Sequence, residues 1–212
     1  MKYSTYLFDW DGCLANTLDV WLEGYKHALN HYKINNVSDE QIVLDFFGTG
    51  NSGAIKYSID PEEFYTQLYP YIEERLKVVS LFDGAAEIIN NLKSKGKKIA
   101  LVSSSMRFVL EPALKHNSLL TLFDAIVAGD DVTKFKPNPE PLLKALEVLR
   151  TNKEDSVMIG DSDKDVLAAQ GAGIDSILYF PDYNVKFYTD NHQRSLNPTY
   201  TIKGFQEILN IK

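Results

Sequence analysis

The second half of the chain repeats one pattern, in which a short apolar run ends at polar or acidic residues and a helical period follows. Four such runs are found, at residues 97–102, 125–128, 156–159 and 177–180. The helical periods lie between or before them, over residues 85–94, 107–115, 139–149 and 164–170. Strands that alternate with helices through short polar turns predict a parallel sheet covered by helices on both faces.

The N-terminal region combines a further strand with a long helical stretch. Residues 3–8 form an aromatic, β-prone run that stops at Asp9. From Thr17 onward apolar residues recur every three or four positions, as in an amphipathic helix, at Leu18, Trp21, Leu22, Tyr25, Leu29 and Tyr32. Ser38 and Asp60 are residue types that cap the start of further helices. We therefore predict that this stretch is all-helical.

These elements imply a divided architecture. We predict an α/β core with a Rossmann-like parallel sheet, built from residues 1–16 and 81–212, and an inserted all-helical cap built from residues 17–80. Residues 181–199 show no convincing period, so we expect a long loop or an irregular addition there.

Charge and cysteine content argue against nucleic-acid binding, membrane binding and disulfide bonds within the chain. The 212 residues include 22 Lys+Arg and 29 Asp+Glu, which gives a net charge of −7. An acidic chain is a poor ligand for nucleic acid or anionic membranes, although a bound cation still allows a small phosphorylated substrate. Cys13 is the single cysteine, so no intrachain disulfide can form. With no signal peptide or membrane span in the sequence, we expect a cytoplasmic protein, as a monomer or a weak homodimer.

Chemically active side chains follow the predicted strands at the point where each strand ends. Ligands of an open parallel sheet bind outside the carboxyl ends of its strands. The polar residues at those ends, or on the loops that follow, are Asp9, Asp11, Ser103, Asp130, Asp131, Lys136, Asp161 and Asp165. Crowded carboxylates repel each other unless a cation bridges them, and a hard cation such as Mg²⁺ suits oxygen ligands. Together with a lysine, Mg²⁺ is a common means of neutralising a phosphoryl group in transfer.

In this order the motifs resemble those of the haloacid dehalogenase-like (HAD) phosphohydrolases. Residues 8–17, FDWDGCLANT, are similar to the first motif of that family, and Ser103 after its strand is similar to the second. The third and fourth motifs have their counterparts in residues 136–139, KPNP, and residues 160–165, GDSDKD. The resemblance covers residues 3–180 and includes the position of the helical insert, which matches a cap of the C1 type. Among the branches of the family, it is similar to the phosphoglycolate phosphatase-like branch.

The resemblance implies a role for each matching residue. Asp9 would be the nucleophile that forms an aspartyl-phosphate, and Asp11 the general acid and base. Ser103 would donate a hydrogen bond to the phosphoryl group, and Lys136 would hold the phosphate and offset the charge of Asp9. Asp161 would bind Mg²⁺ together with Asp9 and the Asp11 carbonyl, while Asp165 would support these ligands.

Other residues are weaker candidates. We predict substrate contacts at Ser104, Gly12, Arg107 and Asn51, from the serine run, the Asp-Gly turn and the cap loop that contains glycines 48 and 50. The aromatic stripe of Trp21, Tyr25 and Tyr32 favours helix packing over substrate binding. His27 and His31 are spaced for a metal but lack a third ligand, which favours an ordinary helix face.

We therefore predict a Mg²⁺-dependent phosphatase that acts on a small phosphorylated metabolite, without naming that substrate. A haloacid dehalogenase does not need Asp11. A β-phosphoglucomutase-like isomerase has a histidine where this chain has Trp21, and an arginine in the cap that is absent here. The non-enzyme alternatives are a phospho-aspartate receiver module, which has no helical insert, and a HAD-like fold kept only for binding. Cys13 and Asn16 depart from the usual first motif and bear on substrate preference.

Overall fold

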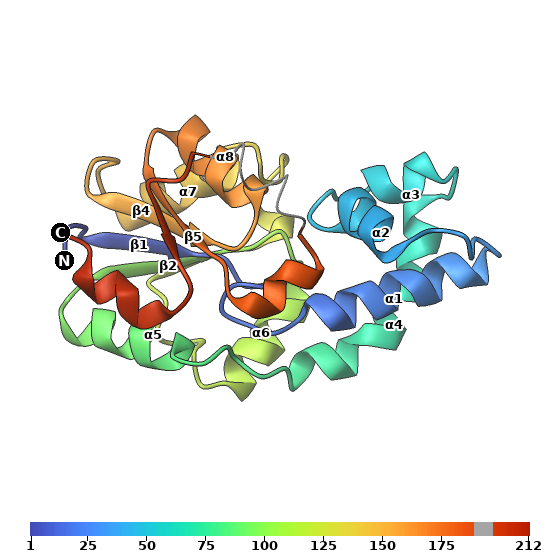
Figure 1. The fold of residues 1–212 in the computed structure, drawn as a ribbon, viewed down its shortest axis with the longest axis horizontal. Coiled ribbons are helices and arrows are strands. Elements are labelled where there is room, and N and C mark those ends of the chain that lie inside the picture. Colours follow the sequence, from blue (N-terminus) through green and yellow to red (C-terminus); the bar gives the residue numbers. More distant parts are fainter. Residues whose placement is uncertain (189–196) are drawn as a thin grey trace.

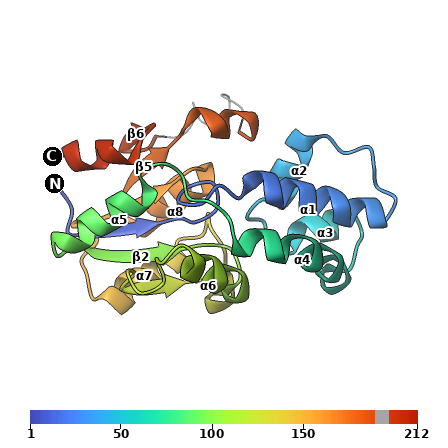
Figure 2. The same ribbon diagram turned by 90° about the horizontal axis from the view of Figure 1, so that it is seen from below.

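The computed structural model describes residues 1–188 and 197–212. Within them the strands form one parallel sheet of six, in the order β3-β2-β1-β4-β5-β6. This confirms the predicted Rossmann-like α/β core (Figure 1) and adds β6, which was not predicted from the sequence and is labelled in Figure 2. The strands are β1 (Thr5–Phe8), β2 (Lys98–Val102), β3 (Ala125–Val127), β4 (Ser156–Gly160), β5 (Asp175–Tyr179) and β6 (Tyr200–Ile202).

Both faces of the sheet are covered by helices, as the near-continuous apolar strands require. One face packs on α5 (Ala85–Ser94), α6 (Arg107–His116) and the 3₁₀ segment η3 (Phe205–Asn210). The other packs on α7 (Glu140–Leu149) and α8 (Asp163–Ala172). Alternate residues of β1 serve the two faces, because Tyr6 and Phe8 join the first apolar cluster and Leu7 joins the second. A further 3₁₀ turn, η1 (Gly129–Asp131), follows β3.

The inserted region is helical, as predicted. It contains α1 (Leu18–His31), α2 (Asp39–Phe46), α3 (Ser52–Lys56) and α4 (Pro61–Lys77). Ser38 and Asp60 cap α2 and α4, where their side-chain oxygens accept hydrogen bonds from the backbone at 3.2 Å and 3.1 Å. These helices share an apolar cluster separate from those of the sheet. They lie at the end of the molecule opposite both termini (Figures 1 and 2). We propose the boundaries of residues 17–80 for the cap on this basis.

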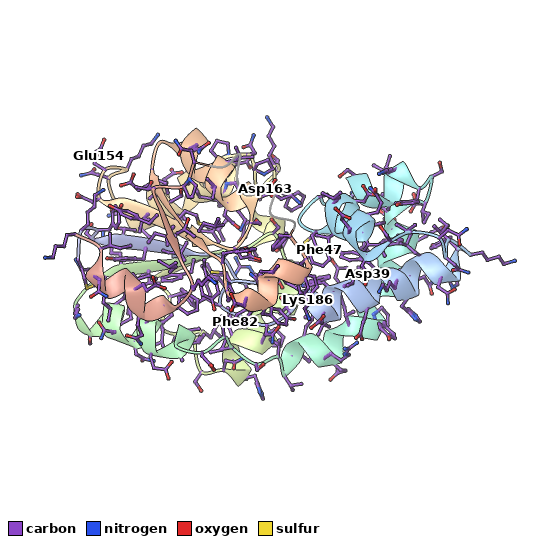
Figure 3. All side chains as sticks on the ribbon, in the orientation of Figure 1. Asp39, Phe47, Phe82, Glu154, Asp163 and Lys186 are labelled. Atoms are coloured by element: carbon purple, nitrogen blue, oxygen red, sulfur yellow. The ribbon has the colours of Figure 1, made fainter. Side chains whose placement is uncertain are left out.

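The segment after β5 runs back to the helical region and contacts the start of α1. For residues 181–199 a long loop or an irregular addition was expected. The described part of this range contains the 3₁₀ segment η2 (Asp182–Lys186), which agrees with an irregular addition, and residues 189–196 lie outside the described residues. The Lys186 ammonium and the Tyr183 hydroxyl both contact the Asp19 carboxylate at the start of α1, at 2.8 Å and 2.6 Å. Figure 3 shows Lys186 and Phe47 close to the junction of the two regions. No helix among the described residues is long and apolar enough to cross a membrane.

Candidate active site

Asp9 is placed at the carboxyl edge of the sheet by β1. It directly follows Phe8, its N–H donates to the Ile159 carbonyl at 2.9 Å, and it is 7% exposed. The chain then turns at Gly12, where φ is 76°. A Cβ at this position would lie 2.2 Å from an Asp161 carboxylate oxygen, so both the turn and the close approach require glycine.

Lys136 is buried beside Asp9. Its Nζ lies 2.8 Å from Asp9 Oδ1 and 2.6 Å from Asp165 Oδ1, and donates to the Val102 carbonyl at 3.1 Å. Burial alone would lower the pKa of Lys136, but the two carboxylates outweigh it and raise the pKa above its ordinary value. Lys136 therefore stays protonated and offers a fixed positive charge next to Asp9.

The buried carboxylates of Asp9, Asp161 and Asp165 form a compact cluster, with one oxygen of each within 4.8 Å of the others. Burial, reinforced by the nearby Asp165, raises the pKa of Asp9 to about 7 and that of Asp161 well above its usual range. Lys136 alone does not balance three carboxylates. The set of hard oxygen donors therefore fits a divalent metal ion.

Asp165 differs from the other two acids in its partners. One of its oxygens binds Lys136, and the other accepts hydrogen bonds from the Ser162 N–H at 3.2 Å and the Ser162 hydroxyl at 2.7 Å. Both oxygens of Asp165 are therefore already engaged, which fits the supporting role predicted for Asp165.

The carboxylate of Asp11 is held on both oxygens. Trp21 Nε1 donates to Oδ1 at 2.7 Å, and the Ser105 hydroxyl donates to Oδ2 at the same distance. The predicted phosphate donor Ser103 is buried, lies 3.4 Å from Asp11 Oδ2, and accepts a hydrogen bond from the Ser105 N–H at 3.0 Å. Ser104 and Ser105, not Ser103, line the cavity described next.

A cavity of about 240 Å³ lies between the strand ends and the helical region. Its core side includes Asp9, Asp11, Lys136 and Asp161. Its other side comes from α1, α2, α4 and the loop that contains Gly48 and Asn51. The two sides also touch directly, because the Lys164 ammonium donates to the Phe47 carbonyl.

Several sequence predictions require correction or extension. Arg107 does not line the cavity. Its guanidinium contacts Asp131 and Glu111, and its backbone N–H donates to the Asp130 carboxylate at 2.9 Å. The acids after β3 therefore serve α6 and do not join the site. Gly12 contacts Asp161 without lining the cavity, whereas Ser104 and Asn51 do line it.

The aromatic stripe of α1 is divided by the fold. Trp21 and Tyr25 line the cavity, so packing is only part of their role, whereas Tyr32 packs in the apolar cluster of the helical region. His27 stacks on Tyr71 with ring centroids 4.1 Å apart, consistent with an ordinary helix face.

Residues from the segment after β5 reach the site and were not predicted. Asn184 is fully buried, and its amide donates to the Gly12 carbonyl at 2.9 Å and to Asp161 Oδ2 at 3.3 Å. Phe187 and Tyr188 line the cavity. Nothing in the local pattern of this segment indicates such contacts, because they depend on how the chain folds back over the sheet edge.

The hydrogen bond from Trp21 to Asp11 leads to a prediction. Trp21→Phe keeps an aromatic ring but removes the donor, so Asp11 would be held less well for the general-acid role that the sequence predicts for it. We expect kcat for an alkyl phosphate to fall by about tenfold, within the range of general acid catalysis. With para-nitrophenyl phosphate, whose leaving group needs little protonation, we expect a much smaller loss. Equal losses on both substrates would rule out this role.

Fold and site together define an α/β protein with a buried acidic cluster that is suited to a metal ion and lies under a set of helices. The sequence matches the haloacid dehalogenase-like hydrolase family over residues 6–179. The chain therefore belongs to this family, and it is a phosphatase of that superfamily.

Individual relatives agree with this assignment. The chain is 32% identical to the pyrophosphatase PpaX of Bacillus mycoides, over 100% of this chain and 97% of the relative. It is 34% identical to PpaX of Anoxybacillus flavithermus over 82% of this chain and 81% of that one. A haloacid dehalogenase-like hydrolase structure from Bacteroides fragilis has a TM-score of 0.84 at 25% identity, and covers 98% of this chain and 100% of its own. CbbY of Rhodobacter sphaeroides shares the fold, with a TM-score of 0.82 at 20% identity over 97% and 96% of the two chains.

Proposed function

We propose that this phosphatase is Mg²⁺-dependent and hydrolyses a small phosphorylated metabolite through an aspartyl-phosphate on Asp9. The observation that carries the proposal is the position of the Asp9 carboxylate. It lies on the floor of the cavity, 2.8 Å from the Lys136 ammonium and within the cluster formed with Asp161 and Asp165.

In the first step an Asp9 oxygen attacks phosphorus. The new Asp9 O–P bond forms as the bond from phosphorus to the ester oxygen breaks, and Asp11 gives its proton to the departing oxygen. Lys136 stabilises the negative charge on the phosphoryl oxygens, with help from the hydroxyl of Ser104 on the cavity wall.

In the second step water attacks the phosphorus of the aspartyl-phosphate. Asp11, now a carboxylate, accepts a proton from this water, and the bond between Asp9 and phosphorus breaks. Inorganic phosphate leaves and both carboxyl groups return to their starting states. Trp21 and Ser105 keep Asp11 in one orientation through both steps, because they hold separate oxygens of its carboxylate.

The metal would be held by Asp9, Asp161 and the Asp11 carbonyl, with Asp165 and Asn184 orienting Asp161 and its surroundings. When bound, Mg²⁺ offsets the charge of the acids and of the phosphoryl group. This donor set contains oxygen only, which favours Mg²⁺ over softer cations.

The geometry around Asp11 favours a phosphatase over the related alternatives. A dehalogenase attacks carbon and has no need for an acid held by two donors at this position. In a mutase-like isomerase the residue at position 21 is a histidine, which can accept and donate protons. The indole N–H of Trp21 only donates.

The proposal is tested by phosphate release from a panel of phosphorylated metabolites, with Mg²⁺ and with excess EDTA. The panel includes pyrophosphate, because the relatives are pyrophosphatases, and phosphoglycolate, because the motifs resemble those of the phosphoglycolate phosphatase-like branch. We expect activity on at least one phosphomonoester with Mg²⁺, and loss of that activity in EDTA with recovery when Mg²⁺ is restored. Undiminished turnover in EDTA would contradict the metal role.

We also propose that the protein is cytoplasmic and is a monomer or a weak homodimer. Cys13 is buried and unpaired, which suits a reducing compartment. Size-exclusion chromatography with light scattering across a range of concentrations tests the assembly state.

A further inference from the structure

We propose that the group esterified to phosphate in the substrate carries an aromatic or heteroaromatic ring. This inference rests on the proposed phosphatase function and names the substrate class for the same site. Three features of the cavity support it: the aromatic residues of its wall, the stacking of their rings, and the small number of lysines and arginines in the wall.

Aromatic side chains dominate the wall of the cavity. Among its lining residues nine are aromatic, from both the helical region and the core: Trp21, Tyr25, Phe46, Phe47, Tyr65, Tyr69, Phe135, Phe187 and Tyr188. Trp21 donates to Asp11, the residue that would meet the leaving group of a bound ester, whereas Tyr188 lies beside Asp161. Such a wall fits a flat apolar group better than a small hydrated one.

Most of these rings also belong to the apolar cluster of the helical region, and two tyrosines of α4 lie at its edge, next to the cavity. On α4 the fully packed side chains are Phe64, Leu68, Ile72 and Leu76, which form one stripe of the helix. Tyr65 and Tyr69 lie one residue after the first two of these, on a neighbouring face, and are only half-buried. They stack on each other with centroids 5.4 Å apart and face the cavity. Tyr65 and Tyr69 thus pack against the edge of the apolar cluster of the helical region and also present a pair of rings to the cavity.

A second stacked pair stands on α1. Trp21 and Tyr25 have ring centroids 5.8 Å apart and planes inclined by 24°. Phe47 lies next to Tyr25, at 5.8 Å, and reaches Phe187 of the core at 6.2 Å. Figure 3 shows Phe47 at the junction of the two regions. Trp21, Tyr25, Phe47 and Phe187 therefore form a connected set of rings that lines the cavity.

The charges of the wall argue against a substrate with a second anionic group. Within the described part of the chain, the cations that line the cavity are Lys136 and Lys164. Lys136 is bound to Asp9 and Asp165, and Lys164 donates to the Phe47 carbonyl. The helical region adds no lysine or arginine to the described wall and does add the Glu40 carboxylate. A second phosphate or a carboxylate would therefore find Lys164 as its one counter-charge in the described wall that no carboxylate already binds, would have to compete with the Phe47 carbonyl for it, and would share the wall with Glu40.

The test compares esters that differ in the ring and not in the reactivity of the leaving group. Benzyl phosphate and propyl phosphate both release a primary alcohol, and pyrophosphate and phosphoglycolate serve as the doubly anionic comparators. With Mg²⁺ present, we expect kcat/KM for benzyl phosphate to exceed each of the others by at least about tenfold, as apolar pockets discriminate between groups of this size. Benzylphosphonate, which is not hydrolysed, should bind with a lower Kd than propylphosphonate.

A matched pair of variants on α4 tests whether the preference for benzyl over propyl phosphate comes from the aromatic wall. Tyr69→Leu removes a ring from the wall and should lower the ratio of benzyl to propyl turnover by at least about fivefold. Tyr71→Leu makes the same change at a residue that is 41% exposed, stacks on His27 and does not line the cavity, so the ratio should stay at its original value.

The outcomes separate this inference from the proposed function. If no ester releases phosphate with Mg²⁺ present, the phosphatase mechanism fails. If esters are hydrolysed but propyl phosphate, pyrophosphate or phosphoglycolate matches or exceeds benzyl phosphate, the mechanism stands and the aromatic substrate class is wrong. The wild-type ratio and the phosphonate affinities decide this even if Tyr69→Leu fails to fold.

Discussion

Replacing Asp9 with asparagine is expected to abolish phosphate release from every substrate that the enzyme accepts. The substitution keeps the size of the side chain but removes the negative oxygen that attacks phosphorus. Because no other group in the cavity replaces a covalent nucleophile, we expect kcat to fall by at least about 10⁴-fold. Initial rates of phosphate release with saturating Mg²⁺ measure this loss.

The covalent step can be checked separately. Wild-type enzyme quenched with acid during turnover should carry a phosphoryl group on the peptide that contains Asp9, and Asp9→Asn should carry none. Asp83→Asn is the matched control, because Asp83 is exposed and does not line the cavity, and it should keep full activity. Full activity of Asp9→Asn, or a phosphorylated residue elsewhere in the chain, would contradict the mechanism.

The fold was predictable from the sequence because its signals are local. Each strand from β1 to β5 is a short apolar run that ends in a polar turn, and α1 has a regular apolar stripe. The 3₁₀ segment η2 and the strand β6 were not predicted, because polar residues interrupt both and neither contains an apolar run like those of β1 to β5. Their positions depend on tertiary contacts, such as those between Lys186 and Asp19.

The site residues could be predicted only where a reactive side chain directly follows a strand or lies on the loop after it. Asp9, Asp11, Lys136, Asp161 and Asp165 come together because parallel strands share one carboxyl edge. The same rule wrongly assigned Asp130 and Asp131 to the site. Asp130 instead accepts from the backbone N–H of Arg107 at the start of α6, and Asp131 binds the Arg107 guanidinium. A strand-end rule places an acid at the edge but does not say whether the following helix uses it as a cap.

Contacts that cross from one region to another could not be derived from spacing. The hydrogen bond from Trp21 to Asp11 depends on how α1 leaves the first loop, and Asn184 reaches Asp161 only because the chain folds back after β5. The aromatic stripe of α1 gave a real signal of burial. A period of three to four residues cannot show that part of such a stripe faces a cavity instead of another helix.

Replacing Lys136 with methionine is expected to cause the largest loss of stability in the site. Its ammonium lies between Asp9 and Asp165, and the side chains of these three residues are at most 10% exposed. Methionine fills a similar volume but leaves two buried carboxylates facing each other without a counter-charge. Removing one partner of a buried ion pair costs about 3–5 kcal/mol, so we expect the free energy of unfolding in EDTA to fall by that amount. Activity should fall by about 10²–10³-fold, because the phosphoryl group loses its fixed positive charge.

Denaturant unfolding at neutral pH, in EDTA and again with Mg²⁺, measures this effect. Mg²⁺ should restore part of the lost stability, because the ion supplies positive charge to the same carboxylates. Adding Asp165→Asn to Lys136→Met should also restore part of it, since one of the two stranded charges is removed. Lys134→Met is the matched control, because Lys134 is exposed and surface substitutions change stability by only about 0.5 kcal/mol. If Lys136→Met unfolds at the wild-type denaturant concentration in EDTA, then Lys136 does not balance the buried acids, and its role in holding phosphate loses its electrostatic basis.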